Sequence, residues 1–421
     1  MLIRCRSYLP LVLVWWIVGQ LPSASASTPL SGDIKFLQQY SQAEDDSLES
    51  SLGETDIRSS ALTVRLIGDY TNQNLELNAH YLLNGQHGNA VKLQNQLKTL
   101  FPDLVVDTQK TQWLRLEHNL ISTDNTLVTH SLDRLYIGHS SEHLVVKLGR
   151  QALSWGNGLV FKPMDLFDPF APNAIDTSYK PGIDMGYAQW LFNDGSDLAA
   201  LVVPRRDPSS GHVESSESSS AAKWHIFQQS LQSDLMLAHD YGDTVAAAAL
   251  SGPWGDALWR FEWVPTFLDN GGQRDSAIFN LENAWTWGNR NVSGYVEYFR
   301  NGFGVGGRDY TLEQLPSYLV KRLARGQVFN TGRDYLAGGV RITWSPLLQI
   351  DPLLIYNLND QSVLLFVHGD YSLSQNLSLD LGINIGFGPK GTEFGGIETS
   401  SGSGVYYKPS NQLYARLAYY F

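Results

Sequence analysis

Charged side chains recur at every second position of several apolar segments, where they could line a water-filled passage. In residues 258–263, Arg260 and Glu262 alternate with Trp259, Phe261 and Trp263. Successive side chains of a β-strand point to opposite faces, so one face of such a strand is charged and the other apolar. We expect either a solute-lining wall with a slight cation preference, or an ion-pair network that only neutralises charge. The candidate lumen residues are Arg65, Glu76, His80, Arg260, Glu262, Asn280, Glu282, Arg341, Asp351, Asp380 and Arg416.

Residues 152–181 combine aromatic, charged and proline residues and are the best candidate for a constriction. Proline fixes one backbone angle and so stiffens a loop. We expect this loop to fold into a barrel and narrow its lumen; the alternative is a compact external loop on the rim. The candidate residues are Trp155, Phe161, Lys162, Asp165, Phe167 and Asp168, with Phe170 and Asp176 beside them.

Enzymatic motifs do not emerge from the sequence. The 10 histidines show no metal-ligand spacing, and no H-E-x-x-H is present. The single cysteine, Cys5, precedes the mature chain. The run from Ser401 to Gly404 has no strand-to-helix elbow around its serines. We therefore expect no enzyme, no catalytic residue, no metal and no cofactor.

Apolar residues recur with a period of two from about residue 60, which favours strands over helices. We count about eighteen segments of roughly ten residues, the length that crosses a bilayer at a tilt. The predicted fold class is all-β, a transmembrane antiparallel barrel of about 18 strands with long extracellular loops; about sixteen strands is the alternative. The predicted strands lie near 61–70, 74–83, 111–120, 126–138, 143–151, 182–192, 196–204, 221–230, 233–241, 244–251, 256–265, 276–287, 291–301, 334–344, 348–358, 362–373, 376–387 and 411–421.

The N-terminus has the features of a secretory signal peptide. Arg4 and Arg6 precede an apolar stretch over 8–21, and Ala24-Ser25-Ala26 is a cleavage site. A membrane anchor is the alternative. We predict a signal peptide over 1–26, a flexible periplasmic arm over 27–58, because this segment is polar and acidic, and an outer-membrane barrel over 59–421.

Connection lengths give a second test of the strand assignment. Bacterial barrels have short periplasmic turns and long outer loops. If the first strand rises from the periplasm, the long segments 152–181, 205–220, 302–333 and 388–410 all lie outside. The segment 84–110 does not fit, because it becomes a long periplasmic connection. It holds either a small helix over 90–100 or a missed hairpin.

The chain ends on an alternating strand whose apolar face carries Leu413, Leu417, Tyr419 and Phe421. This ending resembles the signal of outer-membrane proteins that the barrel assembly machinery reads. It implies a bacterial outer membrane, with lipid and lipopolysaccharide around the barrel. The net charge of −12 disfavours nucleic acid as a partner.

Two segments also resemble a group of proteobacterial porin-like barrels that includes the alginate-export type. One runs from KLGRQALSWGNG (147–158) to FKPMDLFDPF (161–170), and the other covers 350–400, with YNLNDQS (356–362) and GTEFG (391–395). The resemblance implies a transport barrel of about 18 strands whose loops fold over the lumen.

The expected function is an outer-membrane channel for passive or partner-coupled transport of small or polymeric solutes, constricted by 152–181. An export or lipid-handling barrel is the first alternative. It would dock a periplasmic or inner-membrane partner through 27–58 and 84–110. An outer-membrane hydrolase is the second alternative.

Overall fold

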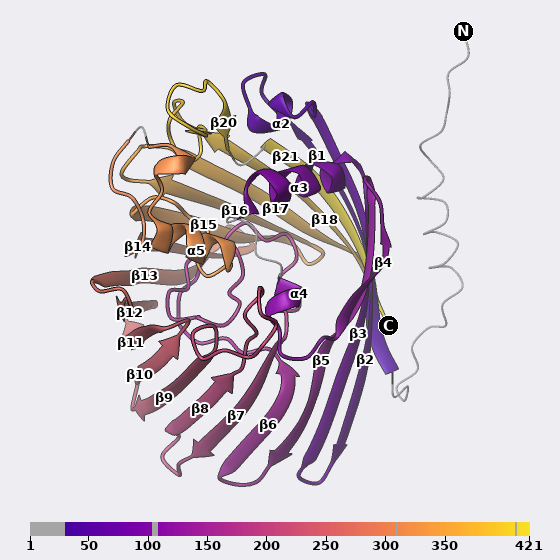
Figure 1. Ribbon diagram of the computed structural model, residues 1–421. Coiled ribbons are helices and arrows are strands. Elements are labelled where there is room, and N and C mark those ends of the chain that lie inside the picture. Colours follow the sequence, from indigo (N-terminus) through magenta and orange to yellow (C-terminus); the bar gives the residue numbers. More distant parts are fainter. Residues whose placement is uncertain (1–29, 103–107, 309, 409–410) are drawn as a thin grey trace.

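The computed structural model describes residues 30–102, 108–308, 310–408 and 411–421 as a closed antiparallel barrel (Figure 1). Its main sheet has 19 strands, of which β4 pairs only with β5 in the described part of the chain. The other 18 strands form the wall, which β1 closes by pairing with β2 and β21. The predicted barrel of about 18 strands is confirmed. The predicted signal peptide lies outside the described residues.

The wall strands follow one another in chain order, each antiparallel to its neighbours. They are β1 (Leu30–Gln42), β2 (Asp56–Asn72), β3 (Leu75–His87), β5 (Thr126–Ser140), β6 (Leu144–Gln151), β7 (Ile183–Leu191), β8 (Asp197–Val203), β9 (Ser219–Gln228), β10 (Leu231–Asp240), β11 (Asp243–Trp254), β12 (Ala257–Phe267), β13 (Gln273–Trp287), β14 (Arg290–Arg300), β15 (Asp334–Ser345), β16 (Leu348–Asn357), β17 (Val363–Ser374), β18 (Leu377–Phe387) and β21 (Asn411–Tyr420). The connections hold β4 (Glu117–Ser122), β19 (Ile397–Glu398), β20 (Tyr406–Tyr407), α2 (Leu48–Ser51), α3 (Asn89–Leu100), α4 (Thr108–Thr111), η2 (Leu312–Gln314) and α5 (Ser317–Ala324).

Strand β1 corrects the prediction of a flexible arm over 27–58. Leu30–Gln42 pairs along its length with β2 and over Asp33–Gln42 with β21, so this part of the predicted arm is barrel wall. Its alternation is weak, because Gln38 faces outward and Leu37 inward. The acidic stretch that follows, 43–55, is the connection that holds α2. Because the composition of 27–58 as a whole is polar and acidic, it favours a disordered segment and does not reveal the strand within it.

The predicted strand 111–120 is also corrected, because it is not part of the wall. Its place is taken by α4 and by β4, which extends the sheet beside the first half of β5, beyond the end of β6. With β1 added and β4 removed, the number of wall strands stays at 18, but β2 and β3 become the second and third wall strands instead of the first and second. The long connection 88–125 then lies on the same side as the other long loops, which removes the exception at 84–110. Of the two alternatives for this segment, the helix over 90–100 is confirmed, as α3.

The two ends of the barrel differ. The chain enters β1 and leaves β21 at the end that carries the short turns, such as 73–74, 141–143 and 346–347. We call this the turn side and the opposite end the loop side. On the loop side lie the connections 43–55, 88–125, 152–182, 204–218, 301–333 and 388–410.

The outward faces of the strands are apolar, and exposed aromatic side chains gather near the turn side. This group includes Phe192, Phe227, Trp254, Trp285, Trp287 and Trp344. Among the helices in the described ranges, none is both long and apolar enough to cross a membrane.

Candidate functional site

The connection 152–182, between β6 and β7, lies inside the ring of strands in Figure 1. We call it the inserted connection. Two glutamates on the inner wall hold its backbone. Glu262 of β12 accepts hydrogen bonds from the backbone N–H groups of Asn157, Gly158 (3.1 Å) and Met164 (3.3 Å). Both glutamates are fully buried (0% exposed), and burying a carboxylate is costly unless its hydrogen bonds are made.

The second glutamate is Glu297 of β14. Its carboxylate accepts from the N–H groups of Leu159 (2.7 Å), Val160 (3.0 Å) and Phe161 (2.8 Å), and from the side-chain amide of Asn280 (2.9 Å). Hydrogen bonds to an ionised acceptor are about twice as strong as neutral ones. Six backbone amides of one short stretch therefore end on two wall carboxylates.

The motif Trp155-Gly156-Asn157-Gly158 makes the turn that presents these amides. Gly156 has φ +105°, which residues with a Cβ rarely adopt, and a Cβ there would lie 2.9 Å from a Glu262 oxygen. A Cβ on Gly158 would lie 1.7 Å from the carbonyl oxygen of Phe161. Both positions therefore require glycine.

Trp155 and Phe167 of the inserted connection pack onto the wall and line no cavity among the described residues. Trp155 and Phe167 form an edge-to-face pair at 5.6 Å and join Met164 in a core with the inner faces of β7–β12. There the wall presents small apolar residues such as Ala199, Ala221, Ala238 and Ala247. The inserted connection covers this apolar part of the inner wall and removes it from water, which is favourable. Trp155 and Phe167 were expected to narrow the lumen with their own rings. Instead, both rings anchor the connection to the wall.

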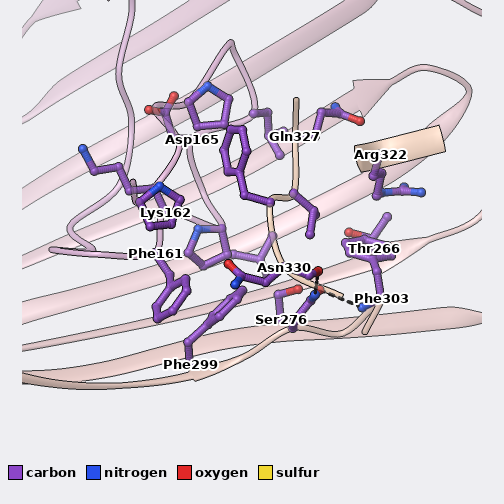
Figure 2. Close-up of a pocket in the computed structure, with 18 of the residues that line it drawn as sticks. Phe161, Lys162, Asp165, Thr266, Ser276, Phe299, Phe303, Arg322, Gln327 and Asn330 are labelled. Carbon is purple, nitrogen blue, oxygen red and sulfur yellow. Dashed lines mark hydrogen bonds between the residues drawn. The ribbon is translucent and has the colours of Figure 1, made fainter. Parts of the chain in front are cut away.

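Phe161 does the same further around the barrel. Its ring stacks on Phe299 at 4.4 Å within a second apolar core that reaches β17. Figure 2 shows these two rings at one end of a pocket of about 70 Å³, between the inserted connection and residues 301–333. Lys162 and Asp165 line this pocket from one side and Arg322 from the other. The pocket has the volume of only a few water molecules.

Lys180 and Asp165 tie the inserted connection to itself. The ammonium of Lys180 donates to both carboxylate oxygens of Asp165 (2.8 Å each) and to the carbonyl of Leu153 (2.5 Å). Burial raises the pKa of Asp165 and lowers that of Lys180, and each partner's charge opposes the other's shift. Asp168 lies on the same connection with φ +59° and lines the larger cavity at the loop side that is described below. Burial also raises its pKa.

The far end of the inserted connection reaches the charged part of the wall, where the barrel closes. The carboxylate of Asp176 accepts from the ammonium of Lys35 on β1 at 2.7 Å and pairs with the guanidinium of Arg416 on β21 at 2.8 Å. Around the ring of 18 wall strands, β12 lies seven strands from β21, and β14 lies five strands from it. The inserted connection therefore crosses the lumen.

Two cavities flank the inserted connection. The loop-side cavity, of about 510 Å³, is lined by the loop-side ends of β6, β7 and β8 (Arg150, Asp184, Val203). The turn-side cavity, of about 590 Å³, is lined by the turn-side parts of β16, β18 and β21 (Asp351, Ser378, Tyr420). The two cavities thus lie at opposite ends of the barrel.

The predicted lumen residues all make contacts within the barrel. Arg65 lines the loop-side cavity, and Glu282, Arg341, Asp351, Asp380 and Arg416 line the turn-side cavity. The other predicted residues lie outside these linings: Glu76 pairs with Lys147, His80 lies against Arg65 and Tyr179, Arg260 pairs with Glu282, and Glu262 and Asn280 support the inserted connection.

Sequence reasoning missed Glu297 and Lys35. Glu297 stands between the outward-facing Val296 and Tyr298, so alternation alone could have selected it. Lys35 lies on β1, whose weak alternation and acidic neighbour favour an arm over a wall strand. Arg322 of α5 is buried and pairs with Asp243 at 2.5 Å.

No family model and no curated protein sequence matches the chain. Among solved structures, OccAB3 of Acinetobacter baumannii aligns over 93% of this chain and 99% of its own, with TM-score 0.51 and 11% identity. OccAB4 of the same organism aligns over 94% and 99%, also with TM-score 0.51 and 11% identity. A triple mutant of the Rhodopseudomonas blastica porin aligns over 93% and 99%, with TM-score 0.45 and 10% identity. The two Acinetobacter structures show a shared barrel fold; the alginate-export likeness stays a resemblance of motifs.

Proposed function

We propose that this chain is an outer-membrane channel for small polar solutes, and that the inserted connection narrows its lumen. The observation that carries the proposal is the path of this connection. It crosses the lumen from Glu262 and Glu297 to Lys35 and Arg416 and leaves a cavity at each end. A polar passage needs cavities with charged walls, and charged side chains line both cavities.

The outer surface supports the membrane location. Outward side chains are apolar along the strands, and exposed tryptophans gather at the turn side, as in Trp254 and Trp287. Aromatic belts of this kind mark the interface between lipid and water. The barrel fold shared with OccAB3 and OccAB4 agrees with a channel better than with an enzyme.

The test is single-channel conductance of the refolded mature chain in a planar bilayer, beside a variant with residues 163–176 replaced by a short glycine-serine linker. We expect conductance in the wild type and a larger conductance in the variant. A silent wild type with a conducting variant would indicate a channel that a partner opens. Silence from both, in protein shown to be folded, would contradict the channel.

A further inference from the structure

The boundary between the two cavities runs along the last part of the inserted connection. Asp176 lines the loop-side cavity, whereas its neighbours Thr177 and Ser178 line the turn-side cavity. The next residue, Tyr179, again lines the loop-side cavity. A solute that passes between the cavities on this side of the barrel must therefore pass this stretch.

Asp176 fixes this stretch to the wall through two cations. Lys35 and Arg416 are only 5% and 10% exposed as side chains, whereas Asp176 is 39% exposed. The ring of Tyr179 lies 4.3 Å from the Arg65 guanidinium and 5.2 Å from the Lys35 ammonium, which adds cation–π contacts at the same place. The stretch is thus held mainly by charge, with no buried apolar side chain in 173–179.

Both cations have a second carboxylate on the wall. Asp33 is 0% exposed and lies 3.9 Å from the Lys35 ammonium. Neither of its carboxylate oxygens has a hydrogen-bond partner in the described residues. Arg416 already donates to Asp380 at 2.8 Å. If Asp176 leaves, Lys35 can turn to Asp33 and Arg416 keeps Asp380, so neither buried cation is left without a counter-charge.

We propose that Asp176 is a latch between the two cavities: bound to Lys35 and Arg416 it divides the lumen, and its release joins the cavities into one passage. The proposal rests on the proposed channel function and adds its regulation. The wall offers two arrangements of the same charges, which is what a reversible switch requires. The inserted connection stays attached to Glu262 and Glu297 in both arrangements, because those contacts lie elsewhere in the barrel.

The test compares Asp176→Asn with Asp46→Asn in single-channel recordings. Asp46 is a matched control: its carboxylate also pairs with a lysine at 2.7 Å, and its side chain is 42% exposed, but it lies in the connection between β1 and β2. We expect the open fraction to rise about tenfold in Asp176→Asn, since the amide loses the charge that strengthens the hydrogen bond from Lys35 and makes the ion pair with Arg416, and to stay at the wild-type value in Asp46→Asn. Asp176→Glu, which keeps the charge, should restore the wild-type open fraction.

A second variant tests the alternative partner. Asp33→Asn removes the carboxylate that would receive Lys35, so the open fraction should fall below the wild-type value. Equal open fractions in Asp176→Asn and Asp46→Asn, in folded channels that conduct, would overturn the latch and leave the channel function standing. Loss of all conductance, including in the variant with residues 163–176 replaced, would overturn the channel function itself.

Discussion

The two halves of the inserted connection are held in different ways. Residues 155–167 are buried against an apolar inner wall and give their backbone N–H groups to Glu262 and Glu297. Residues 173–179 carry no such apolar anchor and are held by ion pairs and cation–π contacts to β1, β2 and β21. Salt screening does not weaken apolar burial, whereas it does weaken partly exposed ion pairs. The first half is therefore a fixed support, and the second half is the part that can move.

The largest effect should come from the apolar support. Phe167→Ala removes a ring that is 1% exposed, and such truncations cost about 3–5 kcal/mol of unfolding free energy. Phe170→Ala, on the same connection at a half-buried position, should cost clearly less. Urea unfolding of both variants in detergent measures the difference. Equal costs would show that the first half is not packed as described.

The carboxylate support should come next. Glu297→Ala leaves three backbone N–H groups without their acceptor, at about 1–3 kcal/mol for each unsatisfied buried group. Glu282→Ala is the control, because Glu282 also faces inward but pairs only with Arg260 in the described contacts. We expect protease cleavage within 155–170 in the first variant alone. Resistance of Glu297→Ala to the protease would contradict the role given to this residue.

The ionic half should respond to salt with little change in stability. Raising the salt from 0.1 M to 1 M shortens the Debye length from about 10 Å to about 3 Å. The open fraction of the wild type should then rise toward that of Asp176→Asn, while the urea midpoint changes little. A wild-type open fraction that does not change with salt would contradict the claim that residues 173–179 are the part that moves.

Acid should have the smallest effect over ordinary conditions. Burial opposes ionisation of Asp176, but the hydrogen bond from Lys35 and the charges of Arg416 and Lys35 hold its pKa well below the usual aspartate range. A depressed pKa stabilises the folded contact above the usual aspartate value and loses that stabilisation only as the pH falls toward the depressed value. The difference in open fraction between wild type and Asp176→Asn should therefore persist from pH 7 to about pH 5. Its disappearance near pH 6 would contradict the ion pairing.

The sequence predicted the wall better than the contents of the barrel. Alternation is a local property, and it predicts the inner face for Arg65, Asp380 and Arg416, which line the two cavities. The acidic segment next to β1 hides the alternation of this strand, so the sequence does not predict it. Strand β4 alternates like a wall strand, but it pairs only with β5 among the described strands and lies outside the wall. The anchoring of residues 157–161 by Glu297 joins positions more than 130 apart, which periodicity cannot reveal.

The aromatic residues show the same limit. The composition of residues 152–181 marks Trp155, Phe161 and Phe167 as a group, but the sequence alone does not say whether their rings contact water or the wall. That depends on the small inward residues of β8–β11, such as Ala199 and Ala247, which are distant in sequence. Only the packed barrel shows that these rings fill the space that the alanines leave.

The central claim is that the inserted connection borders the solute path. The chain has one cysteine, at position 5 in the predicted signal peptide, so a single new thiol can be placed at Ser178 in the turn-side cavity. We would measure the current through Ser178→Cys channels before and after a bulky thiol reagent, beside Thr244→Cys on the outer face of β11. The account predicts a loss of current at Ser178→Cys and none at Thr244→Cys. Full modification of Ser178→Cys with unchanged current would contradict it.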